Sequence, residues 1–216
     1  MARPPSDIRA RIVEAARERF LLQGVDGASL RSIAEDARTN IGMVYYYFKS
    51  KDDLFLAVVE DAYGDLLADM AAALQPDVPA EQRVLRLYER MAAIDEREFQ
   101  VLRVVLREAL ISSARLLRLA QRFEQGHIPL VLGTLADGVQ SGRFDARRDP
   151  AVLAIATAAL AVLPQIVHRL VTAAELPVAE LLPGREAVAR ALWEVLLFGI
   201  AGPQLGGQPA KVDPAP

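Results

Sequence analysis

Apolar residues recur every three or four positions along most of the chain, which is the spacing of one face of a helix. Near the N-terminus Ile8, Ile12 and Phe20 follow this spacing, and the glycines Gly24 and Gly27 come directly after it. Glycine is typical of a helix end, so a turn is expected there. No segment alternates between apolar and polar residues over a useful length. The pattern therefore predicts an all-α protein.

Capping and helix-breaking residues set the limits of the expected helices. Ser29 and Asn40 are suitable N-caps, residues 50–53 have the form of a capping box, and Asp149-Pro150 suits the first positions of a long helix. Pro- and Gly-containing stretches interrupt the pattern elsewhere. The predicted helices cover residues 7–23, 30–37, 41–48, 51–74, 80–94, 96–111, 114–126, 128–141, 149–172 and 185–200.

The first three predicted helices lie within about fifty residues, and a very short connection at residues 37–39 joins the second to the third. This arrangement is typical of a helix-turn-helix domain, here residues 1–51. The fourth helix continues as a connector to about residue 74. Residues 52–201 are expected to form a larger helical bundle, and the Gly- and Pro-rich residues 202–216 are expected to be disordered.

The third helix carries an unusual set of aromatic side chains. Val44 and Phe48 are four residues apart and are expected to point inward, whereas three consecutive tyrosines, residues 45–47, cannot all be buried on one face. An exposed tyrosine can donate its hydroxyl to a phosphate or pack against a sugar or a base edge. Gly42 would let the helix backbone come close to the wall of a DNA groove.

Charged and capping residues around these helices fit the same chemistry. Arg31 stands in the first turn of the second helix, where its guanidinium could contact a guanine edge. Lys51 follows the third helix and is placed to neutralise a phosphate. The helix starts at Ser29 and Asn40 present backbone N–H groups, which also suit phosphate.

The distribution of charge along the chain is more informative about a nucleic-acid partner than the net charge. The net charge is −3, yet residues 1–51 hold nine Lys or Arg and six Asp or Glu, an excess of three positive charges. The remainder of the chain has an excess of six negative charges. A basic head on an acidic body fits a protein that binds nucleic acid with its N-terminal part.

Composition excludes several other classes. The chain has no cysteine, which excludes disulfides and thiolate metal sites. The N-terminus has no apolar segment typical of a secretory signal, and a cytoplasmic location is expected. Residues 151–167 form the longest uncharged run, which is shorter than a membrane span of about 20 residues. It is interpreted as a buried helix, with no membrane partner.

Residues 8–61 resemble the DNA-binding region of tetracycline-repressor (TetR) type regulators. The matching stretches are residues 12–16, Phe20 with Gly24, residues 29–34 and above all residues 42–55. The last stretch follows the family pattern Gly, small or polar, apolar, Tyr, variable, Tyr or His, Phe, x, Ser or Asn, Lys, acidic, x, Leu. The resemblance covers about a quarter of the chain.

The resemblance implies base contacts from Arg31, Met43 and Tyr46, and phosphate contacts from Tyr45, Tyr47 and Lys51. The full candidate DNA-binding set is Ser29, Arg31, Thr39, Asn40, Ile41, Gly42, Met43, Tyr45, Tyr46, Tyr47 and Lys51. It also implies that the remaining chain is an all-helical ligand-binding and dimerisation domain.

Three positions depart from the family pattern. Arg38 stands where the family usually has glycine, so either this residue adopts a left-handed conformation at a cost of about 1 kcal/mol or the turn differs. Ile41 and Met43 replace the more common polar residues. Apolar side chains at these positions would contact thymine methyl groups rather than hydrogen-bonding base edges.

The predicted helix at residues 149–172 is apolar on nearly all faces and should therefore be buried on nearly all faces. Part of its surface is expected to meet a second subunit. The helix at residues 185–200 offers a partner surface, and two such helices from each protomer would form a four-helix homodimer interface. The alternative is a core formed within one chain.

An unidentified small-molecule effector would bind among the helices between residues 80 and 172. Candidate lining residues are Met91, Phe99, Leu102, Leu106, Phe123, His127, Gln165, His168 and Trp193. Arg103, Arg107 and Glu108 are expected to lie on a solvated face; the alternative is that they point inward toward an acidic or basic effector. The sequence indicates no cofactor, no metal site and no enzymatic motif.

These observations favour a homodimeric repressor that binds an inverted-repeat operator in double-stranded DNA and is released when an effector binds. An activator, or a regulator without an effector, would share the same N-terminal half. From a different class, the chain could be a helical interaction module or an enzyme whose head only resembles a helix-turn-helix. Phosphate contacts would make DNA affinity fall steeply with salt, which the last alternative does not predict.

Overall fold

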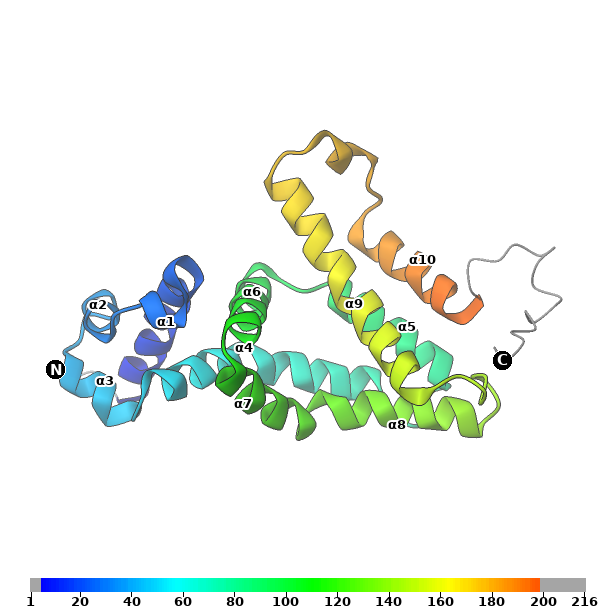
Figure 1. The fold of residues 1–216 in the computed structure, drawn as a ribbon, viewed down its shortest axis with the longest axis horizontal. Helices are drawn as coiled ribbons and strands as arrows, with labels where there is room; N and C mark the ends of the chain where they lie inside the picture. Colours follow the sequence, from blue (N-terminus) through cyan, green and yellow to red (C-terminus); the bar gives the residue numbers. More distant parts are fainter. Residues whose placement is uncertain (1–4, 199–216) are drawn as a thin grey trace, which may run out of the picture. The chain divides into compact units, whose positions relative to one another are not determined.

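The computed structural model describes residues 5–198, and every regular element in that range is helical (Figure 1). The predicted all-α fold is confirmed. The elements are α1 Pro5–Gly27, α2 Leu30–Asp36, α3 Ile41–Tyr47, α4 Lys51–Ala73, α5 Ala80–Ala92, α6 Glu96–Ile111, α7 Ser113–Glu124, α8 His127–Gln140, α9 Pro150–Ala173, the 3-10 helix η1 Pro177–Leu181, and α10 Arg185–Phe198. The predicted disorder of residues 202–216 lies outside the described residues.

The helices form two compact units. Within the described range, the first unit contains residues 5–72 and 94–131, and the second contains residues 73–93 and 132–198. The helices α6 and α7 therefore pack in the same unit as the helix-turn-helix, and α8 runs from the first unit into the second. The predicted boundary at residue 51 separates DNA binding from ligand binding and dimerisation, whereas the two units are defined by packing. The boundary at residue 51 stays a prediction.

One hydrophobic cluster holds the first unit together. It combines side chains from α1, α2, α3, α4, α6 and α7. The rings of Phe20 in α1 and Phe55 in α4 meet edge to face at 6.4 Å, a favourable geometry for aromatic pairs. Because the cluster includes Ile33 of α2 and Val44 of α3, the helix-turn-helix shares its core with α4, α6 and α7.

The helices α1 and α6 run parallel to each other in the first unit. The hydrogen bonds from Arg17 to Gln100 and from the Val25 backbone N–H to Glu108 both join residues 83 positions apart. A constant offset along two helices is the mark of a parallel pair. At Gly24 the backbone leaves helical geometry, with φ of 75°. The sequence prediction of a helix end at this glycine is confirmed.

The second unit is built on α5, α9 and α10, which pack on one another (Figure 1). The indole N–H of Trp193 in α10 donates to the carbonyl of Glu81 in α5 at 2.8 Å. Arg83 of α5, a buried arginine, pairs with Asp137 near the end of α8 at 2.9 Å. These polar contacts join α5 to α10 and to the end of α8.

The helix α9 has one buried face and an opposite face that is open. Asp149 caps its start by accepting hydrogen bonds from two backbone N–H groups, as the sequence indicated. Its buried residues are Thr157, Ala161 and Gln165, four positions apart. The exposed apolar side chains, spaced by three or four residues, are Val152, Ile155, Ala159, Leu163, Val167 and Leu170.

Within the single chain α5 and α10 cover only one side of α9, so a core formed within one chain does not bury its apolar surface, and the expected contact with a second subunit stays a prediction. Its length of 24 residues and the mean hydropathy of 2.0 over its most apolar 18 residues would also suffice for a helix that crosses a membrane.

Candidate nucleic-acid interface

Side-chain caps define the starts of α2 and α3. The hydroxyl of Ser29 accepts a hydrogen bond from the backbone N–H of Arg31 at 3.2 Å, and the side-chain oxygen of Asn40 accepts one from Met43 at 3.0 Å. Both predicted N-caps are confirmed. Since each cap holds the first turn of a seven-residue helix, the caps fix the orientation of the side chains that follow.

The connection from α2 to α3 begins with a Schellman motif. The Thr39 backbone N–H donates to the carbonyl of Ala34, and the Arg38 N–H donates to that of Glu35, both at 2.9 Å. Arg38 occupies the position where glycine is most common, and its φ is 52°. The turn is thus the usual one, and the arginine adopts a left-handed conformation in it.

Replacing Arg38 with glycine should raise the free energy of unfolding by about 1 kcal/mol, because the backbone strain of a side chain at positive φ disappears. Chemical denaturation of the full-length protein measures this change. Arg38→Ala is the matched control, since it removes the guanidinium but keeps the Cβ atom. Equal stability of the two variants would contradict a strained backbone at this position.

The structure separates the inward from the outward face of α3. Val44 and Phe48 are buried, as expected, whereas Tyr45 and Tyr46 are 58 % and 77 % exposed. Tyr47 is half-buried and packs against the hydrophobic cluster of the first unit. Its ring also contacts the ring of Tyr46 edge to face at 5.0 Å. Tyr45 and Tyr46 are therefore accessible to a partner, and Tyr47 packs between the core and the ring of Tyr46.

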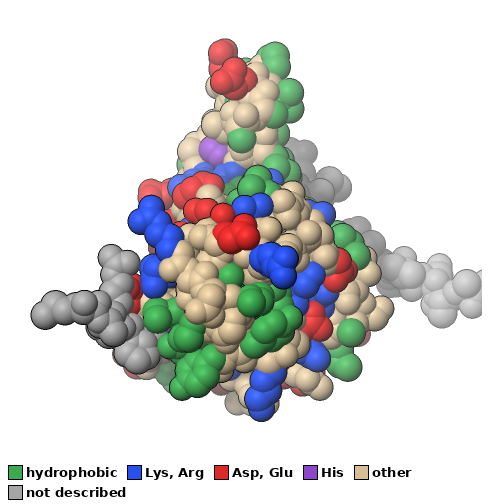
Figure 2. All heavy atoms as spheres, turned by 90° about the vertical axis from the view of Figure 1, so that its left-hand side faces the viewer, with side chains coloured by type: hydrophobic (Ala, Val, Ile, Leu, Met, Phe, Trp, Pro, Cys, Tyr) green, Lys and Arg blue, Asp and Glu red, His purple; other side chains and the backbone are tan. Residues whose placement is uncertain are grey.

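The other predicted DNA-binding residues differ in accessibility. Arg31 and Gly42 are exposed, while Thr39, Ile41 and Met43 are half-buried. Lys51 donates from Nζ to the carbonyl of Asp26 at 2.9 Å, a contact that the sequence did not indicate. Figure 2 looks onto the end of the first unit that carries α2 and α3, and it shows Lys and Arg side chains around hydrophobic ones.

Ion pairs and hydrogen bonds order the basic residues of α1 around α2. Arg11 donates to the carbonyl of Ala37 at 2.8 Å, which satisfies a free carbonyl at the end of α2. Arg19 pairs with Asp36, and its hydrogen bond lowers the pKa of that carboxyl below its usual range. Asp36 is thereby neutralised by a neighbour, which lessens its repulsion of a phosphate backbone.

The nine candidate pocket residues do not lie in one unit. Phe99, Leu102, Leu106, Phe123 and His127 belong to the first unit, and Met91, Gln165, His168 and Trp193 to the second. In the first unit the Tyr63 hydroxyl accepts a hydrogen bond from the His127 backbone N–H at 2.9 Å and lies 2.8 Å from its Nδ1. Burial lowers the pKa of His127, which favours the neutral ring.

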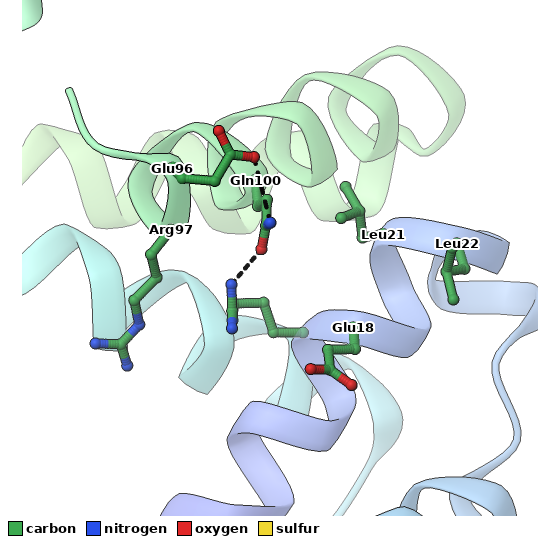
Figure 3. A pocket seen from close by; sticks show the side chains of 7 residues that line it. Glu18, Leu21, Leu22, Glu96, Arg97 and Gln100 are labelled. Carbon is green, nitrogen blue, oxygen red and sulfur yellow. Dashed lines mark hydrogen bonds between the residues drawn. The ribbon is translucent and has the colours of Figure 1, made fainter. Parts of the chain in front are cut away.

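A hollow of about 470 Å³ lies between α1 and the first half of α6 (Figure 3). None of the predicted pocket residues lines it; the lining residues are Arg17, Glu18, Leu21, Leu22, Glu96, Arg97 and Gln100. Gln100 accepts a hydrogen bond from Arg17 and donates one to Glu96 at 3.3 Å, so it bridges the two helices across the hollow.

In the described part of the chain, no three His, Asp or Glu side chains are grouped as metal ligands would be.

A buried ionic group at the base of the helix-turn-helix escaped the sequence analysis. Glu108 is buried, and the expectation that it lies on a solvated face is wrong. It pairs with Arg115, which is also buried. The helical spacing held the signal, because Glu108 follows Val101 and Val104 on the buried face of α6. The sequence analysis placed Glu108 on a solvated face because its side chain is charged.

The sequence matches the family model of bacterial regulatory proteins of the tetR family over residues 12–58. The chain is 33 % identical over 142 residues to an HTH-type transcriptional repressor of Streptomyces coelicolor, and the match covers 65 % of this chain and 69 % of the relative. A fatty acid metabolism regulator protein of Bacillus subtilis is 22 % identical over 133 residues, which are 62 % of this chain and 69 % of the relative.

Solved structures share the fold over nearly the whole described chain. The transcriptional regulator FadR from Bacillus subtilis, solved in complex with stearoyl-CoA, has a TM-score of 0.69 at 20 % identity and covers 89 % of this chain and 99 % of its own. The TetR family transcriptional regulator PfmR from Thermus thermophilus has a TM-score of 0.66 at 23 % identity, covering 89 % and 100 %. At these identities the likeness shows the fold alone.

Proposed function

Because this chain belongs to the TetR family of bacterial regulatory proteins, we propose that it is a repressor released from its operator by a small molecule. The relatives are transcriptional regulators, which are not enzymes. The observation that carries the proposal is the outward face of α3, where Tyr45 and Tyr46 stand exposed on a capped helix. The N-terminal helix-turn-helix would place this face in the major groove.

In the proposed complex, Arg31, Met43 and Tyr46 contact bases, and Tyr45, Tyr47 and Lys51 contact phosphates. The exposure of Arg31 and Tyr46 supports their roles. Lys51 would keep its bond to the Asp26 carbonyl, since an ammonium group has three donors. Tyr47 would contact DNA only with the part of its ring that the core leaves open.

We propose that two copies associate through α9 and α10. The exposed apolar side chains of α9 form a continuous stripe, and Val195 and Phe198 of α10 are exposed as well. A second copy would cover this stripe with apolar side chains of its own, and the polar Thr157 and Gln165 lie outside the stripe, on the buried face of α9. Two-fold symmetry would then match an inverted-repeat operator.

Three buried polar atoms support an internal effector site in the second unit. The hydroxyls of Tyr88 and Thr157 and the amide oxygen of Gln165 have no hydrogen-bond partner in the described structure. Leaving such a group unpaired costs about 1–3 kcal/mol, which a ligand with matching polar groups would recover. Gln165 belongs to the predicted pocket set.

The proposed release mechanism is a shift between two conformations. An effector that binds one of them more tightly raises its population. In that conformation the two recognition helices of the dimer no longer match successive major grooves, which lie about 34–36 Å apart. Repression of this kind acts on the chromosome, so the proposed location is the cytoplasm.

Selection of duplexes from a random pool tests the proposal. The full-length protein is expected to enrich an inverted repeat at low salt and to lose affinity steeply as salt rises. The repeat then serves to screen effectors, beginning with acyl-CoA thioesters because the Bacillus subtilis relative binds stearoyl-CoA. No enrichment at low salt would overturn the proposal, and transcription that rises when the protein binds would favour an activator.

A further inference from the structure

The turn at residues 23–27, which leads from α1 to α2, is held by side chains from three other helices. Arg107 of α6 donates to the Gln23 carbonyl at 3.3 Å, and Glu108 of the same helix accepts from the Val25 backbone N–H at 3.0 Å. Lys51 of α4 donates to the carbonyl of Asp26. The backbone that sets the position of α2 is thus tied to α4 and α6.

Arg115 of α7 is the centre of these contacts. Its guanidinium binds both side-chain oxygens of Asp26 in the turn, donates from Nε to Asp52 of α4 at 3.0 Å, and donates from Nη1 to Glu108 of α6 at 2.6 Å. All three of its nitrogens are used. We call Arg115, Asp26, Asp52 and Glu108 the Arg115 cluster.

The two ends of the Arg115 cluster differ in exposure. The side chains of Arg115 and Glu108 are 9 % and 3 % exposed, whereas that of Asp26 is 74 % exposed. The buried end is paired and hydrogen-bonded, which is the condition under which buried charges are tolerated. The Arg115 hydrogen bond lowers the pKa of Asp26. The planar guanidinium fixes direction as well as distance, because its donors form a rigid fork.

We infer that Arg115 is a positioning residue for operator recognition, which holds the turn before α2 against α6 and α7 and restricts the half-site spacing that the dimer accepts. The inference rests on the proposed function, since spacing has meaning only for a dimer on an inverted repeat. If the helix-turn-helix were held less firmly, the dimer would bind half-sites at neighbouring spacings with a smaller loss of affinity.

The test compares affinities for the selected operator and for duplexes whose half-site spacing is changed by one or two base pairs. Asp26→Asn is the main variant, because this exposed position loses its charge without leaving a buried ion unpaired. Glu60→Gln is the matched control: it removes a carboxylate of α4 that pairs with Arg122 of α7 at 3.3 Å and does not touch the turn. Arg115→Lys is the second variant, since the three donors of an ammonium group cannot replace the four hydrogen bonds that the guanidinium makes.

Wild type and Glu60→Gln should discriminate strongly between spacings. For Asp26→Asn and Arg115→Lys, the discrimination should fall about tenfold, the effect of one lost charged hydrogen bond. A purely structural role would lower the thermal midpoint or weaken all spacings equally. An unchanged spacing profile in both variants would overturn the positioning role. A wild type that binds no duplex would overturn the proposed function as well.

Discussion

Replacing Ile155 with glutamate is expected to convert the dimer into monomers and to reduce operator affinity by at least about 100-fold. Ile155 belongs to the N-terminal half of the exposed apolar stripe of α9 and is 68 % exposed in the single chain. In a two-fold interface the change appears on both subunits, so two carboxylates would have to lose their water. Each monomer would then bind one half-site, without the higher affinity that a dimer gains by binding both half-sites at once.

Light scattering or sedimentation measures the mass of the Ile155→Glu variant, and titration with labelled operator measures its affinity. Leu110→Glu is the control, because Leu110 is an equally apolar and even more exposed residue on α6. It should leave mass and affinity close to those of wild type. A dimeric Ile155→Glu variant with normal operator affinity would mean that the stripe on α9 is not the interface.

The double replacement Arg31→Ala with Tyr46→Ala should abolish selective operator binding. A base-reading side chain contributes about 1–3 kcal/mol of discrimination, so the two together should account for at least about 30-fold in affinity. Both side chains are exposed, and the Ser29 cap bonds the backbone rather than the side chain of Arg31. The variant should therefore keep its fold and its dimeric mass.

Competition between the operator and a scrambled duplex, at matched salt, separates base reading from general attraction to phosphate. The double variant should bind both duplexes alike, with the residual salt-dependent affinity of the remaining basic residues. Arg86→Ala removes an exposed arginine in the second unit and should change neither affinity. Retained preference for the operator would assign base reading to residues other than Arg31 and Tyr46.

The helix limits and the helix-turn-helix could be predicted because the signals act over a few residues. Ser29, Asn40 and Asp149 cap the helices that follow them, and Gly24 breaks α1. At Arg38 the sequence left two possibilities, a left-handed residue or a different turn, and the φ of 52° shows the first. Each of these effects depends on backbone groups within about five positions, so the sequence contains all the partners.

Burial on α9 and the contacts of Lys51 required the structure. An apolar helix of 24 residues shows that its surface must be covered, but it does not show which face packs within the chain and which stays open. Lys51 had the right place for a phosphate contact, and its bond to the Asp26 carbonyl depends on how α4 meets the turn after α1. Both facts depend on packing between distant helices.

The sequence by itself determined the helical fold, the helix caps and the fact that the three tyrosines of α3 cannot all be buried, because helical periodicity and capping are local. Only the tertiary structure decided that Glu108 is buried and that Arg115 joins it to Asp26. Arg115 and Asp26 are 89 positions apart, and the chain has 25 basic and 28 acidic side chains that could pair. Charge carries no directional or periodic signal, so only packing selects the partners.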